Sequence, residues 1–154
     1  MPREDSTKPK RYSHSVHRFS FLPPQGWQVV EPGPGDAVVA FIGPRKGVGS
    51  PYMSVEVHDA KGLTLKEYDK LSKERAKKIL EGYALVSERD AKTGNLRGHE
   101  VRITFKRNRL PVFARIFYGI NRGRLYVVTC MTFRQMADQY AAAFDKALNT
   151  FRVW

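Results

Sequence analysis

Cysteine, long apolar runs and negative charge are all scarce in this sequence of 154 residues. Its one cysteine, Cys130, can form neither an internal disulfide nor a cysteine-based zinc site. The longest apolar stretches, residues 37–42 and 127–131, fall far short of the roughly 18 residues that a membrane-spanning helix needs. The charged first twelve residues lead into no hydrophobic region, so a secretory signal is not expected. These absences exclude a disulfide-stabilised domain and a helical membrane protein.

The composition fits one packed domain. Hydrophobic residues make up 42% of the chain, aromatic residues 12% and charged residues 27%. A chain of this length buries roughly 70% of its unfolded surface, so it needs no disulfide or metal to fold. Residues 1–15 mix proline, serine, lysine and arginine without periodicity, which predicts a flexible basic tail. We therefore expect a single domain over residues 16–154.

Positive charge is concentrated in one segment. The chain carries 27 basic and 15 acidic residues, and residues 96–124 hold eight of the basic ones against Glu100 alone, a net +7. The basic residues of this segment are Arg97, Arg102, Lys106, Arg107, Arg109, Arg115, Arg122 and Arg124. Arginine favours bidentate pairing with carboxylate or phosphate. The segment is therefore consistent with solvated side chains, with an interface for an acidic protein, or with a nucleic-acid interface.

Two matches to the capping box predict helices. Thr64 and Glu67 open a pattern whose apolar residues recur at three- and four-residue spacing up to Gly82. Its expected inward residues are Leu65, Tyr68, Leu71, Ala76, Ile79 and Leu80. Thr132 and Gln135 open a second pattern, which predicts a helix over about 133–149. The expected inward residues of that helix are Met136, Tyr140, Ala141, Phe144, Ala147 and Leu148.

The remaining apolar segments predict strands. Short strands are expected near residues 17–22, 27–31, 37–42 and 52–57, separated by segments rich in proline and glycine. Between the helices, residues 101–106 alternate apolar and polar side chains, and two further strands follow through the turns R-N-R-L-P and N-R-G. These last two strands are apolar on both sides and need a covering layer on each face. The sequence thus predicts an α+β fold, an antiparallel β-sheet covered by helices on both faces in an α/β/α sandwich.

Few residues suggest chemistry. Glu56, His58 and Asp59 stand together at a strand end and are weak candidates for a metal site or an acid–base pair. One strand supplies too few ligands, and no serine or cysteine nucleophile is patterned nearby. Cys130 lies in an apolar strand, where burial would make its thiol inert. We therefore expect no catalytic residue, no cofactor and no enzymatic activity.

A longer string carries a family resemblance. The segment F-S-F-L-P-P-Q-G-W contributes Phe19, Phe21, Pro23, Gly26 and Trp27, and it resembles the start of PsbP-like and DcrB-like domains. Three later strings extend the likeness over about residues 16–153: G-L-T-L-K-E-Y, N-R-G-R-L-Y-V-V and F-D-K-A-L-N-T-F-R-V. They resemble the entry to the first long helix of that superfamily, its last hairpin, and its closing helix with the terminal phenylalanine strand.

The resemblance implies a non-enzymatic accessory protein. The superfamily includes an extrinsic subunit on the lumenal side of photosystem II that helps to retain calcium and chloride, bacterial envelope lipoproteins, and a eukaryotic branch that binds the GTPase Ran. The implied location is the bacterial envelope or the thylakoid lumen if a signal has been removed, and otherwise the cytoplasm.

The leading hypothesis is a binding protein that docks on an acidic protein, or on a membrane-protein complex, through the arginines of residues 96–124. Two alternatives remain open. The same basic face could bind nucleic acid, or the protein could carry a small apolar ligand between its sheet and a helix.

Overall fold

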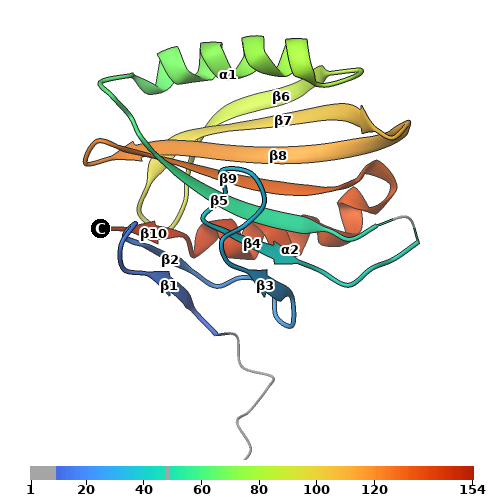
Figure 1. The fold of residues 1–154 in the computed structure, drawn as a ribbon, viewed down its shortest axis with the longest axis horizontal. Helices are drawn as coiled ribbons and strands as arrows, with labels where there is room; N and C mark the ends of the chain where they lie inside the picture. The colour runs from blue at the N-terminus through green and yellow to red at the C-terminus, as the bar shows by residue number, and fades with distance from the viewer. Residues whose placement is uncertain (1–9, 48) are drawn as a thin grey trace, which may run out of the picture.

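The computed structural model describes residues 10–47 and 49–154, which form two antiparallel sheets with two α-helices and a 3-10 helix (Figure 1). The larger sheet has seven strands in the order β3-β4-β5-β9-β8-β7-β6, and the smaller has the order β1-β2-β10. The strands of the larger sheet are β3 (Gln28–Val30), β4 (Val39–Ile42), β5 (Tyr52–Asp59), β6 (Ala84–Lys92), β7 (Arg97–Arg107), β8 (Leu110–Asn121) and β9 (Arg124–Phe133). Those of the smaller sheet are β1 (Tyr12–His14), β2 (Phe19–Phe21) and β10 (Arg152–Val153). The helices are α1 (Leu65–Ile79), η1 (Arg134–Met136) and α2 (Ala137–Asn149).

The predicted α+β class with an antiparallel sheet is confirmed. The meander expected between the helices is present as β7, β8 and β9, paired in register over most of their length. Asn108 and Arg109 both have positive φ and make a two-residue turn between β7 and β8. Arg122 and Gly123 make the matching turn between β8 and β9.

The two helices contact alternate residues of the central strands. Tyr140 and Phe144 of α2 belong to one buried cluster with Phe117 and Val128. In a second cluster, Leu65 and Tyr68 of α1 pack against Tyr118 and Val127. Successive side chains of a strand point to alternate faces, so α1 and α2 contact different side chains of β8 and β9.

The first predicted helix begins where its capping box lies. Thr64 Oγ1 accepts the Glu67 N–H at 3.1 Å, and Glu67 Oε1 accepts the Thr64 N–H at 3.2 Å. The inward stripe differs from the prediction, because Leu71 and Ile79 are 52% and 64% exposed. The half-buried side of α1 instead includes Asp69 and the neighbouring polar side chains Ser72 and Lys73.

The second predicted cap is wrong. Strand β9 continues to Phe133, η1 follows, and α2 begins only at Ala137 without a side-chain cap. Thr132 pairs with Phe113 in the β8–β9 ladder, and its Oγ1 is buried with no hydrogen-bond partner. Because β9 continues past this threonine and α2 begins only at Ala137, Thr132 lies too far from the helix to cap it. Ala141, expected to point inward, is exposed.

Two parts of the fold were not expected from the sequence. Strand β6 forms one edge of the larger sheet, and it is exposed over most of its length, so it has no apolar alternation. Residues 10–15 of the predicted tail contain β1, which pairs with β2. The rest of that tail, residues 1–9, lies outside the described residues.

Candidate functional site

The structure places six of the eight predicted docking residues at the two opposite ends of the sheet. Lys106, Arg107 and Arg109 lie at the turn between β7 and β8, whereas Arg97, Arg122 and Arg124 lie at the other end. Strand β7 runs from one group to the other. It has 11 residues and therefore spans about 33 Å. The charge that is contiguous in the sequence thus forms two separate groups in space.

The other two predicted residues are paired internally. Arg115 is only 6% exposed, and its guanidinium lies 3.0 Å from Glu100 Oε1 and 2.5 Å from Asp145 Oδ1. Burial acts to lower the pKa of Arg115, but Glu100 and Asp145 more than offset this effect and raise it. Arg102 Nε also lies 3.0 Å from Glu100 Oε1. Arg115 therefore contributes no free charge to the surface, and the charge of Arg102 is partly compensated.

One end of the molecule gathers cations from three separate segments, and we call it the basic end. Its members are Arg45, Lys46, Lys77, Lys78, Lys106, Arg107 and Arg109, and all seven are exposed. In Figure 1 the end of α1, the β7–β8 turn and the β4–β5 loop follow one another from top to bottom along the right-hand side. The Lys106 N–H donates to the Glu81 carbonyl at 2.8 Å, and Arg107 lines a small pocket with Gly49 and Ser50.

The cations of the basic end make no ion pair with any other residue of the described chain. The segment that follows α1, next to Lys77 and Lys78, also carries the acidic residue Glu81. Sequence reasoning did not find Arg45, Lys46, Lys77 and Lys78, because they lie far along the chain from residues 96–124. Only the folding of α1 and the β4–β5 loop beside the β7–β8 turn brings them together.

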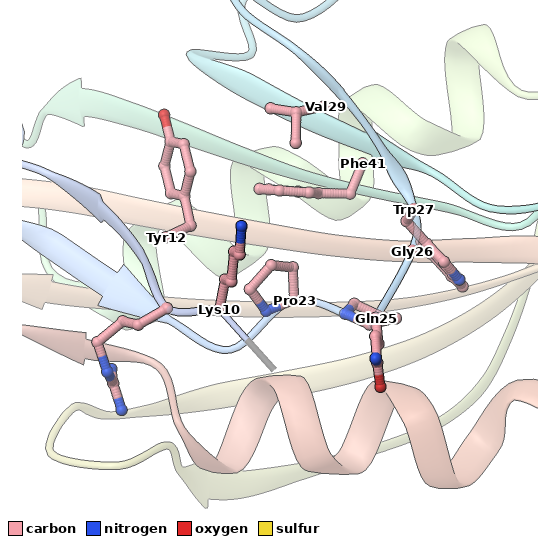
Figure 2. A pocket seen from close by; sticks show the side chains of 10 residues that line it. Lys10, Tyr12, Pro23, Gln25, Gly26, Trp27, Val29 and Phe41 are labelled. Carbon is pink, nitrogen blue, oxygen red and sulfur yellow. The ribbon is translucent and has the colours of Figure 1, made fainter. Parts of the chain in front are cut away.

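An aromatic cavity lies between the smaller sheet and the β3–β4 pair (Figure 2). Its walls are Lys10, Arg11, Tyr12, Pro23, Pro24, Gln25, Gly26, Trp27, Val29 and Phe41. In Figure 2, Tyr12 and Lys10 line one side and Trp27 the other, with Pro23 between them and Phe41 and Val29 opposite. Three of the residues that carried the family resemblance, Pro23, Gly26 and Trp27, therefore line this cavity.

The predicted acid and imidazole residues of β5 come together only in part. His58 Nε2 lies 3.2 Å from Glu56 Oε1. Asp59 Oδ1 instead accepts the Lys61 N–H at 2.9 Å in the following turn. Within the described residues, the one group of three with metal-ligand geometry lies elsewhere, at Asp69, Glu88 and His99.

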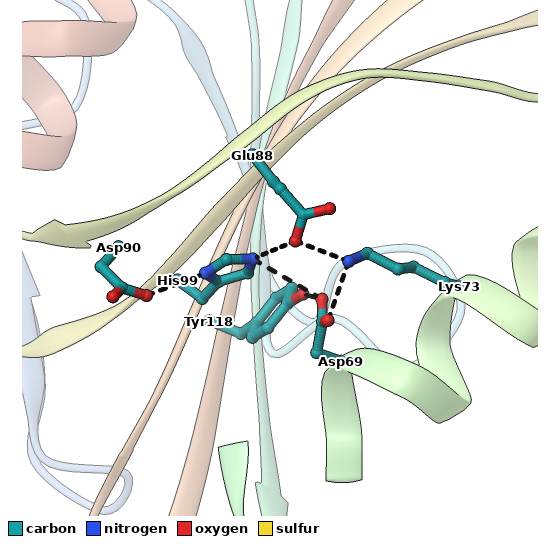
Figure 3. A network of polar contacts seen from close by, with 6 residues as sticks. All are labelled: Asp69, Lys73, Glu88, Asp90, His99 and Tyr118. Atoms are coloured by element: carbon teal, nitrogen blue, oxygen red, sulfur yellow. Dashed lines mark hydrogen bonds and ion pairs between the residues drawn. The ribbon is translucent and has the colours of Figure 1, made fainter. Parts of the chain in front are cut away.

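That group is part of a polar network beneath α1, which we call the Lys73 network (Figure 3). The Lys73 ammonium lies 2.8 Å from Asp69 Oδ2 and 2.7 Å from Glu88 Oε1. His99 contacts Glu88 at 2.8 Å and Asp90 at 3.2 Å, and the Tyr118 hydroxyl donates to Asp69. Sequence reasoning missed this network, because its members come from four separate elements, α1, β6, β7 and β8.

Lys73 already supplies the positive charge that a metal ion would bring to these carboxylates. Burial acts to lower the pKa of Lys73, but hydrogen bonds from its ammonium to Asp69 and Glu88 raise it overall. Burial likewise acts to raise the pKa of Asp69, but Lys73 and Tyr118 lower it overall. The network thus links α1 to the sheet through one ammonium held between two carboxylates.

No family model matches the chain, and no curated protein matches it. Several solved structures, in contrast, match the chain over most of its length. Cyanobacterial PsbP (CyanoP) from Synechocystis sp. PCC 6803 is 19% identical, with a TM-score of 0.69 over 100% of this chain and 97% of that one. LpqN, involved in cell envelope biogenesis of Mycobacterium tuberculosis, is 11% identical, with a TM-score of 0.65 over 95% and 90%. The Saccharomyces cerevisiae Ran-binding protein Mog1p is 10% identical, with a TM-score of 0.66 over 95% of each chain.

These matches extend over nearly the whole chain, and they confirm the PsbP-like fold that the sequence suggested. At these identities the likeness concerns the fold, because one fold supports many functions. None of the three is described as an enzyme. Among the described residues, the helices are too short and too polar to cross a membrane.

Proposed function

We propose that this protein is a non-catalytic binding protein that docks on an acidic protein surface through its basic end. The observation that carries the proposal is the gathering of seven exposed cations from three segments, none of them in an ion pair with a described residue. Unpaired charge of one sign attracts an oppositely charged surface and speeds the encounter with it. The partner that fits is an acidic protein, free or as part of a membrane-protein complex.

The scaffold suits this role. We infer that α1 and α2 cover opposite faces of the larger sheet, since they contact alternate residues of β8 and β9. A sheet held from both sides would present its end loops in a fixed arrangement. The Ran-binding protein Mog1p has the same fold and a protein partner, which supports a protein as the ligand.

The chemistry of the described residues favours binding over catalysis. Burial raises the pKa of the Cys130 thiol to about 12, so the thiol is a poor nucleophile at neutral pH. His99 is engaged with carboxylates beneath α1. We therefore propose no reaction for this protein.

Charge reversal tests the proposal. The variant K106E/R107E/R109E reverses three cations of the basic end, and the control K92E/R97E/R122E reverses three exposed cations at the opposite end with the same change in net charge. Each protein is immobilised and used to capture partners from the native extract, and each melting temperature is measured. We expect the partner to be retained by the parent and the control but lost by the basic-end variant, with melting temperatures unchanged.

Two results would contradict this function. Equal loss in both variants would mean that net charge alone, and not the basic end, attracts the partner. Titration with fluorescent single- and double-stranded DNA and RNA at two salt concentrations examines the alternative, because binding to phosphates falls steeply with salt. Tight, salt-sensitive binding that the basic-end variant loses would identify nucleic acid as the ligand instead.

A further inference from the structure

A small pocket at the basic end combines an apolar floor with a basic rim, and we call it the anchor pocket. Its apolar lining comes from Tyr52, Val112, Met131 and Phe133, and its polar lining includes Ser50 and Arg107. Its volume is about 210 Å³, below the roughly 300–1,000 Å³ that is usual for small-molecule sites. The anchor pocket therefore suits one inserted side chain better than a whole small molecule.

The apolar floor of the pocket is built by neighbours on adjacent strands. Met131 of β9 pairs with Tyr52 of β5, and Phe133 of β9 pairs with Val112 of β8. Residues directly opposite one another in an antiparallel pair share a face, so these four side chains form one continuous patch. Val112 is buried, whereas Tyr52, Met131 and Phe133 keep part of their surface accessible. A partner that covers this accessible apolar surface gains binding energy.

The β4–β5 loop rests on this floor through Gly49. This glycine lies so close to the Phe133 ring that a β-carbon at its position would collide with the ring. The Lys46 N–H donates to the Gly49 carbonyl at 2.9 Å, which ties the two residues together. Walls that are already ordered lose little conformational entropy when a partner binds.

The rim of the pocket carries positive charge. Arg107 is one of the lining residues, and Lys46 adjoins the pocket through its backbone pairing with Gly49. Lys106 and Arg109 flank Arg107 at the β7–β8 turn. Among the described residues no carboxylate lines the pocket, and the Arg107 guanidinium makes no ion pair. An apolar centre inside a charged rim is the usual arrangement of a protein–protein interface.

Since the basic end docks on an acidic protein under the function proposed above, we propose that the anchor pocket receives one large apolar side chain of that partner, flanked in the partner's chain by aspartate or glutamate. The apolar side chain would lie on Tyr52, Met131 and Phe133, where aromatic rings and a flexible thioether pack closely against it. The flanking carboxylates would meet the cations of the basic end. The partner is thus recognised by an acidic segment with an apolar residue at its centre.

Short synthetic peptides test the central apolar residue. Two acidic peptides of aspartate and glutamate differ only at the central position, which is phenylalanine in one and alanine in the other. Calorimetry with the full chain measures their binding. We expect the phenylalanine peptide to bind at least about tenfold more tightly, because its ring buries additional apolar surface. A third peptide, with lysines around the same phenylalanine, should not bind, because like charges repel.

Ser50 allows the pocket to be filled without a change in the core. It lines the pocket and is partly exposed, so S50W should fold and place an indole at the pocket. Pro44 supplies the control, because it is exposed in the same loop and does not line the pocket, so P44W adds the same ring elsewhere. We expect S50W to bind the two acidic peptides equally and P44W to keep the preference for phenylalanine. Circular dichroism checks that both variants fold.

The failure of this inference differs from the failure of the docking function. If the parent binds the two acidic peptides equally and K106E/R107E/R109E loses both, the docking function stands and the anchor pocket is overturned. A preference for phenylalanine that S50W retains would place the ring outside the pocket and would also overturn the inference. If neither acidic peptide binds the parent, or if K106E/R107E/R109E binds both as the parent does, the docking function fails and the inference fails with it.

Discussion

Lys73 places a cation between two carboxylates that belong to different elements. Asp69 lies four residues before it on α1, whereas Glu88 lies on β6. Without the ammonium, the two carboxylates would face one another with His99 and Tyr118 close by. Exposed ion pairs contribute little to stability, but this lysine is only 23% exposed and donates to two acceptors.

K73M should therefore destabilise the fold by about 1 kcal/mol, through the loss of two charge-assisted hydrogen bonds and the repulsion that remains. Lys70 offers the control, because it is an exposed lysine of the same helix. K70M should change the free energy of unfolding by less than about 0.5 kcal/mol. Urea denaturation followed by circular dichroism measures both, and equal effects of the two variants would show that the Lys73 network does not stabilise the protein.

At the scale of elements, two similar sequence signals lead to different structures. Thr64 caps α1 because the chain before it is a turn, and its hydroxyl is free to accept the Glu67 N–H. Thr132 lies inside one of the two longest paired regions of the sheet, where β8 and β9 are paired along ten residue pairs. A ladder of that length outweighs a cap worth about 1 kcal/mol.

This difference predicts opposite effects of similar substitutions. T64A should cost about 1 kcal/mol of stability, since it removes the hydroxyl that accepts the Glu67 N–H. T132V should cost nothing or stabilise the protein, because it replaces a buried hydroxyl that has no hydrogen-bond partner. Thermal unfolding of the two variants beside the parent checks the pair. A large loss of stability in T132V would show that its hydroxyl does have a partner in solution.

The same reasoning separates what could and could not be predicted from the sequence. Strand β7 was predictable because its apolar residues keep a period of two, and β8 and β9 because they are apolar runs bounded by turn residues. Strand β6 was not, since eight of its nine residues are exposed and its apolar residues keep no such period. One part of the basic end was predictable, because Lys106, Arg107 and Arg109 lie close together in the sequence. The other part was not, because Arg45 and Lys77 come near them only in the folded chain.

For the whole molecule, the Lys73 network couples stability to pH. Hydrogen bonds from Lys73 and His99 hold the pKa of Glu88 below its usual value. For Asp69, burial acts to raise the pKa, but the hydrogen bonds from Lys73 and Tyr118 lower it overall. A carboxyl whose pKa is lower in the folded state stabilises the protein above its usual pKa, and this contribution disappears as the pH falls through the lowered value.

The parent should accordingly keep this contribution at pH values above the usual pKa values of 3.8 for Asp69 and 4.5 for Glu88, and lose it below them. K73M lacks the cation that lowers both pKa values, so its stability should fall less than that of the parent on acidification. Urea midpoints between pH 7 and pH 3, at constant ionic strength, measure the difference. Parallel curves for the two proteins would show that other carboxyls control the acid transition.

The smaller sheet places β1 and β10 on either side of β2. Strands beside a shared neighbour lie about 10 Å apart, since adjacent strands are separated by about 4.8 Å. Asn95 fixes β10 further, because its side-chain amide exchanges two hydrogen bonds with the backbone of Val153. A short glycine-rich bridge from Trp154 to Lys10 could therefore join these strands, and new ends could open in the exposed loop at Lys46. Such a circular permutant, which omits residues 1–9, would keep every sheet pairing and place its free termini at the basic end.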